Sequence, residues 1–522
     1  MADLFAGFDV STQGCKLVVI DRVAGDVVFV GAVSYDEDLP AYATRDGVIQ
    51  DVVEGVSESD PLMWLAAVEL VLERLRSSAV PIEEIRCVSV SGQQHGLVAL
   101  ECAGELARST SKLWNDYSTI EECEILTQRV GGLDAMIEAV GNSQRPGYTA
   151  GKILHMRRHE PESYDRATTL FLVHNYINWH LTGGVSVMEP GDTSGTALWN
   201  PATGRWARVV IDAIDPKLLD KLPEVHPSDR SIGTISPEFV VRFGFSPECQ
   251  VDAGSGDNMY GAIGTGNVRE GIVTVSLGTS GTACCFLKEP FVDPEGEIAC
   301  YCDSTGHYLP LVCVSNLANG YNEMLRLHGI GHEEFNDLAD STAPAEEGRL
   351  LIPWFTGERT PDLPQATPVF FGFGLDSFTK EKLCRAVLDG HVLNLHAAFV
   401  RMPGKVEELR LTGGLARSDA WCQTIADVCE AEVVPVEGEG AALGAALHAA
   451  WVWLEEAGKG VPIEELVEAF VVLDHRRRMQ PRPDRVEAYR TLKRLFEAVS
   501  RRLRGLEGGD PFRIRSEMLG GP

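Results

Sequence analysis

The feature of this sequence that most constrains its fold is a strand–turn–strand unit that occurs twice, once near the start of each half of the chain. The first unit has an apolar strand pattern at Leu4–Val10, a tight turn, and a returning strand that ends at Asp21. The second has a strand pattern at Ile272–Leu277, a Gly-Thr-Ser-Gly turn and a returning strand over 283–287. Two such units indicate a duplicated fold. Because 522 residues are too many for one compact core, we expect two or more domains.

The charge balance limits the partners that this chain can have. Lys and Arg number 46 and Asp and Glu number 76, which gives a net charge of −30. This excess of acid argues against nucleic acid and against an anionic membrane, since both need a basic face. The odd number of scattered cysteines, 13, and the absence of a basic, apolar leader favour a reducing, cytoplasmic location. We expect small-molecule partners, and the sequence leaves a homodimer open.

The first turn has the composition of a phosphate site. Asp9 ends the first strand, and Thr12 and Lys16 follow in and after the turn. Backbone N–H groups, a hydroxyl and a cation at one point suit a terminal phosphate, and Asp9 can hold Mg²⁺ at the same place. An acid with Ser or Thr in a turn is common, so this turn alone is weak evidence.

Two further turns have phosphate-binding character. One is Gly278-Thr279-Ser280, and the other is Gly413-Gly414, which precedes a predicted helix that begins at Ser418. Ser418 is a further candidate contact for ATP, because it lies at the start of that helix. The chain has neither a GxxxxGK[ST] loop nor a GxGxxG after its first strand. The three turns therefore favour a nucleoside triphosphate held between two domains, and they disfavour a dinucleotide-dependent dehydrogenase.

Two polar stretches at strand ends suit a polyol. The stretch Gln93–Gly96 offers amide and imidazole groups for hydroxyls through Gln94 and His95. In the second stretch, Trp114 can cover a C–H face and Asp116 can accept from a hydroxyl. The alternative for His95 is a histidine that only satisfies a strand end, and the residues alone leave both readings open.

Asp257 lies at mid-chain in the glycine-rich stretch Asp252–Tyr260. The simplest interpretation is an ordinary Gly-Asp turn. If a sugar alcohol and MgATP meet here, however, a carboxylate can accept the proton of the hydroxyl as the γ-phosphoryl group leaves ADP. Asn258 then becomes a candidate sugar contact.

One histidine pair has metal-compatible spacing. His155 and His159 are four residues apart in a predicted helix, but no acid lies between them and no third ligand is evident. We interpret them as surface or packing histidines.

Several of these motifs, in this order, resemble the FGGY family of carbohydrate kinases over roughly residues 4–500. The motifs that carry the resemblance are Gly7-Phe8-Asp9, Trp114-Asn115-Asp116, Gly256-Asp257, Leu277-Gly278-Thr279-Ser280 and Gly413-Gly414. Within the family, Gln93–Gly96, Leu113–Asp116 and Gly256–Asn258 are most similar to the xylulose kinase group. The loop residues Ser11, Gly14 and Cys15 depart from the hydroxyl-rich loop common in the family.

The resemblance implies an α/β fold of two actin-like, ribonuclease H-like domains that face each other across a catalytic cleft. It implies a sugar-binding domain over 1–248, an ATP-binding domain over 249–480, and a C-terminal helix and tail over 481–522 that pack back on the body. Residues 506–522 look loose in sequence.

The implied activity is ATP-dependent phosphorylation of the 5-hydroxyl of D-xylulose. Asp257 is implied as the base, Gln94 and His95 as sugar contacts, and Asp9 as the residue near Mg²⁺ and the γ-phosphate. One alternative is a kinase for another ketose or a polyol, such as a D-ribulose-type substrate. The other is an actin-like ATPase that needs no sugar.

Overall fold

The fold was analysed in a computed structural model that describes residues 3–50 and 52–520. Residues 1–2 and 521–522, which include the start of the chain and the end of the predicted loose tail, lie outside the described residues. Contacts divide the chain into two compact units. The first unit comprises residues up to 269 together with 286–310 and 438–471, and the second comprises 270–285, 311–437 and 472–522. The units alternate along the chain, whereas the domain ranges expected from the sequence are continuous.

The first unit is built on a seven-stranded sheet with the order β15-β16-β7-β1-β2-β3, in which β17 also pairs with β7. Its strands are β1 (Leu4–Val10), β2 (Gly14–Asp21), β3 (Asp26–Ser34), β7 (Ile85–Gly92), β15 (Ser231–Thr234), β16 (Gln250–Asp252) and β17 (Ser255–Gly256). Strands β1, β2 and β3 form an antiparallel meander, while β7 runs parallel to β1 and β16 runs parallel to β7. The first predicted hairpin is therefore confirmed.

The second unit repeats this arrangement in its six-stranded sheet, which has the order β20-β19-β18-β23-β24-β25. Its strands are β18 (Ile272–Leu277), β19 (Gly281–Cys285), β20 (Leu311–Val314), β23 (Glu408–Thr412), β24 (Glu432–Glu437) and β25 (Val472–Leu473). Again an antiparallel meander is followed by two parallel neighbours, and an antiparallel strand closes the edge beside β24. The strand-by-strand correspondence supports the duplication that the repeated hairpin predicted.

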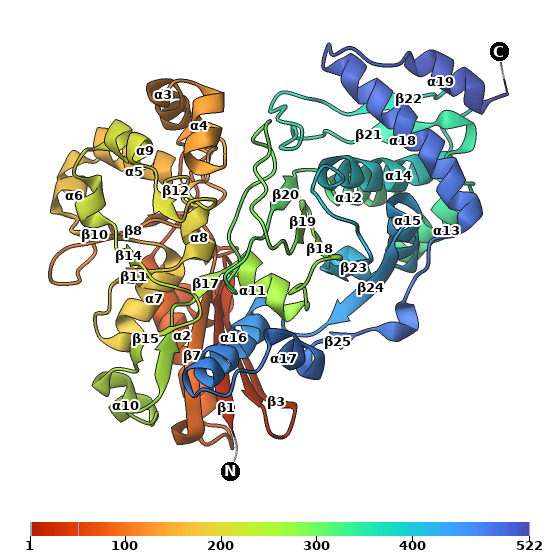
Figure 1. The fold of residues 1–522 in the computed structure, drawn as a ribbon. Helices are drawn as coiled ribbons and strands as arrows, with labels where there is room; N and C mark the ends of the chain where they lie inside the picture. The colour runs from red at the N-terminus through yellow and green to blue at the C-terminus, as the bar shows by residue number, and fades with distance from the viewer. Residues whose placement is uncertain (1–2, 51, 521–522) are drawn as a thin grey trace. The chain divides into compact units, whose positions relative to one another are not determined.

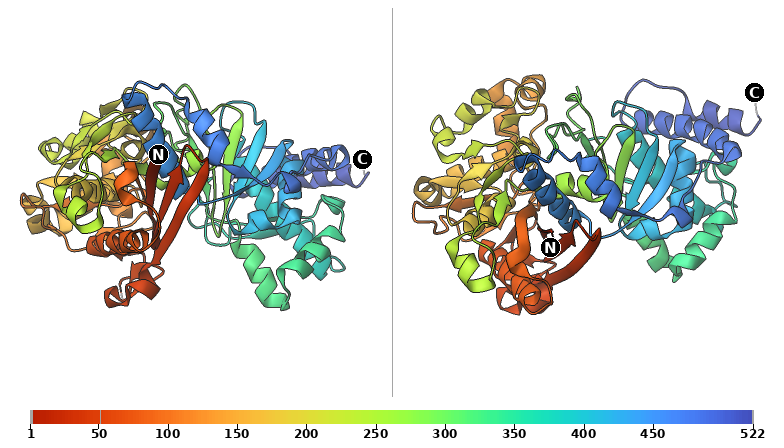
Figure 2. Two further views of the ribbon diagram at one scale, coloured as in Figure 1. Left: turned by 90° about the horizontal axis from the view of Figure 1, so that it is seen from below. Right: turned by 60° about the horizontal axis from the view of Figure 1, so that its bottom comes forward.

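Two helices of the first unit show why the sequence folds as it does. Helix α2 (Pro61–Arg76) packs on β2 and β3; Asp60 caps it by accepting a hydrogen bond from the backbone N–H of Leu62. Helix α16 (Ala441–Glu456) contacts β1, β2 and β7, and Figures 1 and 2 show it beside these strands. Small residues allow this approach, because a Cβ at Gly7 would lie 2.2 Å from the carbonyl oxygen of Ala442.

The one polar residue in the buried stretch of α16 has partners that satisfy it. His448 is fully buried; its Nδ1 lies 2.8 Å from Oδ2 of Asp252, and its Nε2 lies 2.8 Å from the carbonyl oxygen of Ser304. Burial alone would lower the pKa of His448, but Asp252, the hydrogen bond to Ser304 and the charge of Glu189 together outweigh burial, and the pKa is raised. The histidine that interrupts this apolar run is thus a structural ion-pair partner.

Other helices of the first unit that bear on the site are α3 (Ile120–Val130), α5 (Thr149–His159), α7 (Val173–Thr182), α8 (Pro190–Ser194) and α11 (Asp257–Gly264). The helices that cover the second unit are α12 (Asn319–His328), α13 (His332–Asp340), α14 (Lys380–Phe399), α15 (Asp419–Cys429), α18 (Pro483–Leu503) and α19 (Pro511–Met518). Among the described residues, none of the helices combines the length and the apolar character needed to cross a bilayer.

The sequence predicted a loose tail over 506–522, and this prediction is wrong for Pro511–Met518, which form helix α19. Asp510 caps this helix by accepting from the backbone N–H of Phe512, and Pro511 stands in its first turn. Arg515 anchors it to the second unit by donating to the carbonyl oxygens of Glu347 and Gly372. The Asp-Pro start signal was present in the sequence and was overlooked.

Candidate active site

The first unit brings three predicted site residues, Asp9, Gln94 and Asp257, to one edge of its sheet. Strands β1, β7 and β17 are parallel neighbours and end together: Asp9 is in register with Ser91, and Gly256 is in register with Gly92. Asp9 therefore lies at the same carboxyl edge as the residues after β7 and β17. Ligands of open α/β sheets bind at this edge, because the loops that follow neighbouring strands converge there.

Asp257 is the first residue of α11 and follows β17 directly. Asp257 is a partly buried residue. Burial raises the pKa of Asp257 to about 8, and repulsion from Asp9 and Asp192 adds to this rise. Backbone N–H bonds from Asn258 and Gln94 act in the opposite direction. A carboxylate with a pKa close to neutrality is suited to accepting a proton.

A chain of hydrogen bonds connects Asp257 to buried residues behind it. Asn258 donates from Nδ2 to Oδ1 of Asp257 (3.0 Å) and to Oε1 of Gln94 (2.7 Å). Gln94 in turn donates from Nε2 to Oδ1 of Asp192 (3.4 Å), and Oδ2 of Asp192 lies 3.1 Å from Nδ1 of His174. Because Asp192 can only accept, it fixes which end of the Gln94 amide faces Asn258.

His95 is held in an unusual backbone conformation. Its φ is 67°, in the left-handed region that few residues other than glycine adopt. Its carbonyl oxygen accepts from Nζ of Lys152 (2.7 Å) and from the hydroxyl of Thr149 (3.3 Å), both on α5. The ring lies 4.8 Å from that of Tyr148, measured between centroids. A non-glycine residue held at this φ by a buried lysine is typical of a position where function fixes the backbone.

Lys152 is itself fully buried. Burial lowers its pKa to about 7, against the opposing attraction of the Asp116 carboxylate. A lysine in this environment donates hydrogen bonds at a smaller electrostatic cost than a permanently charged arginine would incur.

The first turn is hydrogen-bonded to two residues of the stretches predicted to bind sugar, which the sequence did not predict. The hydroxyl of Thr12 donates to Oε1 of Gln93 (3.3 Å) and accepts from Nε1 of Trp114 (3.0 Å). Ser11 closes the turn through its backbone N–H and its hydroxyl, both donated to the carbonyl oxygen of Gly14. Thr12, predicted for ATP, and Trp114, predicted for sugar, thus form one hydrogen-bonded group.

Two charged residues of this region have defined partners. Oδ1 of Asp9 accepts from the hydroxyl of Ser91 (2.9 Å), and burial raises the pKa of Asp9 although Ser91 and Lys16 oppose the rise. Lys16, directly across the hairpin from Asp9, forms an ion pair with Glu439 at 2.9 Å, in which each side chain is about one-third exposed.

Asp116 is fully buried, and both oxygens of its carboxylate accept hydrogen bonds from other residues of the protein. Oδ2 accepts from the backbone N–H of Ser57 (2.9 Å) and from Nζ of Lys112 (3.4 Å), and Oδ1 accepts from the backbone N–H and hydroxyl of Ser118. These bonds hold the loop that carries Trp114. The geometry favours a positioning role for Asp116 over direct sugar contact.

In the second unit, the two predicted glycine turns lie at the carboxyl ends of the parallel neighbours β18 and β23. The carbonyl oxygen of Thr279 accepts from the backbone N–H groups of Leu317 and Ala318, which ties the Gly278–Ser280 turn to the loop before α12. Gly413 has φ 91°, and a Cβ there would lie 2.6 Å from the carbonyl oxygen of Leu277. Only glycine fits this crossing.

Ser418 is the N-cap of α15. Its hydroxyl accepts from the backbone N–H of Trp421 (3.4 Å) and donates to Oδ1 of Asn336 (3.1 Å). Its side chain is thus engaged in forming the helix start.

Sequence reasoning missed Asp192, His174 and Lys152. Asp192 lies in the polar, glycine-rich 190s, where Glu189 caps α8 by accepting from the backbone N–H groups of Gly191 and Asp192. The Glu-Pro-Gly-Asp stretch was a usable helix-start signal. No local pattern marks His174 or Lys152, because their roles depend on contacts with residues 18 and 57 positions away.

Comparison with known proteins gives matches over most of the chain. The N-terminal domain of the FGGY family of carbohydrate kinases matches residues 4–264, and the C-terminal domain of that family matches residues 273–453. The xylulose kinase of Haemophilus influenzae is 36% identical over 497 residues, which cover 93% of this chain and 97% of that protein.

Solved structures agree on the fold. A ligand-bound xylulose kinase from Lactobacillus acidophilus superposes with a TM-score of 0.85 at 24% identity, covering 96% of this chain and 98% of that one. A gluconate kinase from the same organism gives 0.86 at 23% identity, covering 96% and 98%. The prediction of an α/β kinase fold in two parts is confirmed. The two matched domains span most of the chain, and we conclude that it belongs to the FGGY family of carbohydrate kinases and is a carbohydrate kinase.

Proposed function

We propose that this enzyme transfers the γ-phosphoryl group of ATP to the 5-hydroxyl of D-xylulose, with Asp257 as the general base. The observation that carries the proposal is the position of Asp257 beside Asn258 and Gln94, with a pKa of about 8. The name of the Haemophilus influenzae relative supports the choice of sugar. In the reaction, Asp257 accepts the proton of the sugar's primary hydroxyl. The hydroxyl oxygen bonds to the γ-phosphorus as the bond between that phosphorus and ADP breaks.

The sugar contacts proposed are Gln94, His95, Trp114 and Asn258. The amides of Gln94 and Asn258 are oriented before the sugar arrives, since each is already hydrogen-bonded to its neighbours. Pre-oriented donors and acceptors lower the entropic cost of placing a hydroxyl next to the base. Asp116 acts by holding the loop of Trp114, which accepts a polyol's C–H face.

Use of ATP follows from membership of a kinase family. We assign its phosphates to backbone groups at Gly278–Ser280 and Gly413-Gly414, with Thr12 and Lys16 at the first turn. Mg²⁺ fits Asp9, because this carboxylate offers a hard oxygen at the end of β1, and burial raises its pKa although Ser91 and Lys16 oppose the rise. When bound, Mg²⁺ supplies charge neutralisation for the phosphates.

A second candidate is a kinase for another sugar. The gluconate kinase structure matches as well as the xylulose kinase structure does, so fold alone does not select the substrate. Ketoses such as D-ribulose, and polyols, remain alternatives for the same site. An ATPase that needs no sugar is disfavoured by the hydrogen-bonded group around Gln94, which such an ATPase would not require.

The test is a coupled assay of ADP release with a panel of ketoses, alditols and sugar acids. We expect D-xylulose to give the highest kcat/KM and a blank without sugar to be slow. Turnover with D-ribulose or an alditol but none with D-xylulose would overturn the substrate assignment and leave the kinase. ATP turnover of equal rate with and without sugar would contradict the sugar kinase itself.

A further inference from the structure

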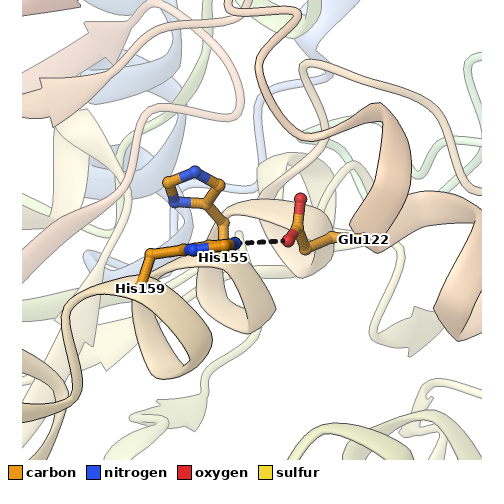
Figure 3. Close-up of side chains that lie close together, drawn as sticks. All are labelled: Glu122, His155 and His159. Atoms are coloured by element: carbon orange, nitrogen blue, oxygen red, sulfur yellow. Dashed lines mark hydrogen bonds and ion pairs between the residues drawn. The ribbon is translucent and has the colours of Figure 1, made fainter.

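A cluster of two histidines and a glutamate lies on helices α3 and α5 of the first unit. His155 and His159 project from successive turns of α5, and Glu122 faces them from α3 (Figure 3). The sequence suggested no third ligand for this histidine pair, because Glu122 is 33 positions before His155 in the chain. The packing of α3 against α5 supplies that ligand.

The geometry is close to that of a metal site. One ligand atom from each residue lies within 4.8 Å of the other two, and Nε2 of His159 is 3.1 Å from Oε1 of Glu122. In a tetrahedral zinc site with bonds of about 2.0–2.2 Å, ligand atoms lie about 3.3–3.6 Å apart. The ligand atoms here lie up to 4.8 Å apart, which is more than a tetrahedral site requires. Rotation of the His155 and His159 rings, whose centroids are 4.6 Å apart, can bring these atoms closer together.

The alternative is that the cluster is only an ion pair. Arg158 donates from its two terminal nitrogens to Oε1 of Glu122 (2.5 Å) and to Oε1 of Glu121 (2.7 Å). This explains Glu122 and His159 but gives His155 no role. Nδ1 of His155 is buried and has no hydrogen-bond partner among residues 3–50 and 52–520, so the ion pair leaves a polar atom unsatisfied.

Access and charge also suit a metal ion. Glu122 is almost fully buried while half of the His159 side chain is exposed, so an ion can enter from the His159 side. Arg158 can move away without losing its charge partner, because Glu121 is an exposed carboxylate within its reach. Two imidazoles and one carboxylate, with water as a fourth ligand, form a donor set that binds zinc in preference to Mg²⁺ or Ca²⁺.

We propose that Glu122, His155 and His159 bind a divalent transition metal ion of the zinc class, at a site separate from the sheet edge where the reaction is proposed. The bound ion would join α3 to α5. Helix α5 also carries Lys152 and Thr149, which hold the carbonyl oxygen of His95. Metal binding is therefore expected to stabilise the helix that supports the His95 backbone.

The proposal is tested by titrating the metal-free, full-length protein with Zn²⁺ in competition with a chromophoric chelator, and with Co²⁺ followed by visible absorption. We expect one site per chain, and His155→Ala and His159→Ala should each weaken binding by more than about tenfold, since even outer partners of metal ligands contribute roughly 10–100-fold. The matched control is His226→Ala, which removes a histidine that also lies near a glutamate, Glu224, but outside the cluster. It should leave binding unchanged.

Arg158→Ala separates the metal site from the ion pair. If Arg158 competes with the metal for Glu122, its removal should tighten Zn²⁺ binding. If the cluster is an ion pair alone, neither the wild type nor Arg158→Ala binds Zn²⁺ at this site. Thermal unfolding with and without Zn²⁺ gives a second readout, in which the metal raises the Tm of the wild type but not of His155→Ala. A wild type that binds no Zn²⁺, or a His155→Ala variant that binds as tightly as wild type, overturns the proposal.

Discussion

The carboxyl edges of the two main sheets are built by the same strand arrangement but from different chemistry. In the first unit the edge is made of side chains: Asp9, Gln94, Asp257 and Asn258 contact one another or a buried residue behind them. In the second unit the edge is made of backbone, and the Gly278–Ser280 and Gly413-Gly414 turns place main-chain groups there.

This difference matches what each edge is proposed to bind. A sugar is distinguished by the positions of its hydroxyl groups, and these are read by amides and carboxylates that point in fixed directions. A phosphate is recognised by charge and by N–H groups, which any backbone supplies. A duplicated fold can therefore diverge by changing side chains at one edge and keeping glycine at the other.

The largest expected effect comes from removing the base at the side-chain edge. Asp257→Asn keeps the shape but cannot accept the proton, so kcat should fall by roughly 10²–10⁴-fold. Binding of sugar and of a non-hydrolysable ATP analogue, measured by calorimetry, should stay near the wild-type values. A kcat within a few-fold of wild type would remove Asp257 from the base role.

The backbone edge is broken by Gly413→Ala. At φ 91° and ψ 178° a residue other than glycine costs about 1–3 kcal/mol, and the added Cβ would also meet the carbonyl oxygen of Leu277. We expect the KM for ATP to rise by about tenfold or more and the Tm to fall. The matched control is Gly414→Ala, where a Cβ would meet nothing within 4 Å. Equal effects of the two variants would contradict the assignment of Gly413 to a backbone crossing.

The side-chain edge also predicts a pH dependence. Asp257 must be ionised to act, so kcat/KM for sugar should rise with pH. The rising limb of this pH profile should have an apparent pKa near 8. Asp192→Asn removes a negative neighbour that raises the pKa of Asp257, while its Oδ1 can still accept from Gln94. The limb should therefore move to lower pH. An unchanged limb would show that Asp192 acts on the base only through hydrogen bonds.

The smallest effect is expected from the charge pair at the first turn. Lys16 and Glu439 are both about one-third exposed, so solvent screens their attraction. Glu439→Gln should change the free energy of unfolding by less than about 1 kcal/mol in urea titrations. A larger loss would contradict the expectation that solvent screens this pair.

Much of the fold was predictable because its signals are local. The alternation of apolar residues located both hairpins, and Asp60-Pro61 located the start of α2. The course of α16 was not predictable, because its burial against β1 depends on matching small residues such as Gly7 and Ala442, which are more than 400 positions apart in sequence. For the same reason the alternation of the two units along the chain was not expected.

The candidate site divides in a similar way. Residues within motifs, such as Gln94 and Asp257, were recognisable from turn chemistry and their order along the chain. Asp192 and Lys152 were not, because each acts on a motif residue from another element, and the sequence carries no sign of that contact. Ser418 shows the converse, since a residue chosen for its position proved to be engaged in capping a helix.

The placement of α16 has a consequence for how the enzyme is made. Helix α11, which begins with Asp257, ends at Gly264, and Gly264 lies so close to Gly440 that a Cβ would come within 2.0 Å of its carbonyl oxygen. On the ribosome, the segment from residue 264 to 441 takes roughly 9–35 s to elongate. Throughout that interval the nascent first unit exposes Phe5, Val18 and Tyr260, which α16 later covers. A protein quality-control system would meet an unfinished apolar surface, and a chain released early at residue 437 would carry every proposed sugar-binding side chain without the helix that backs them.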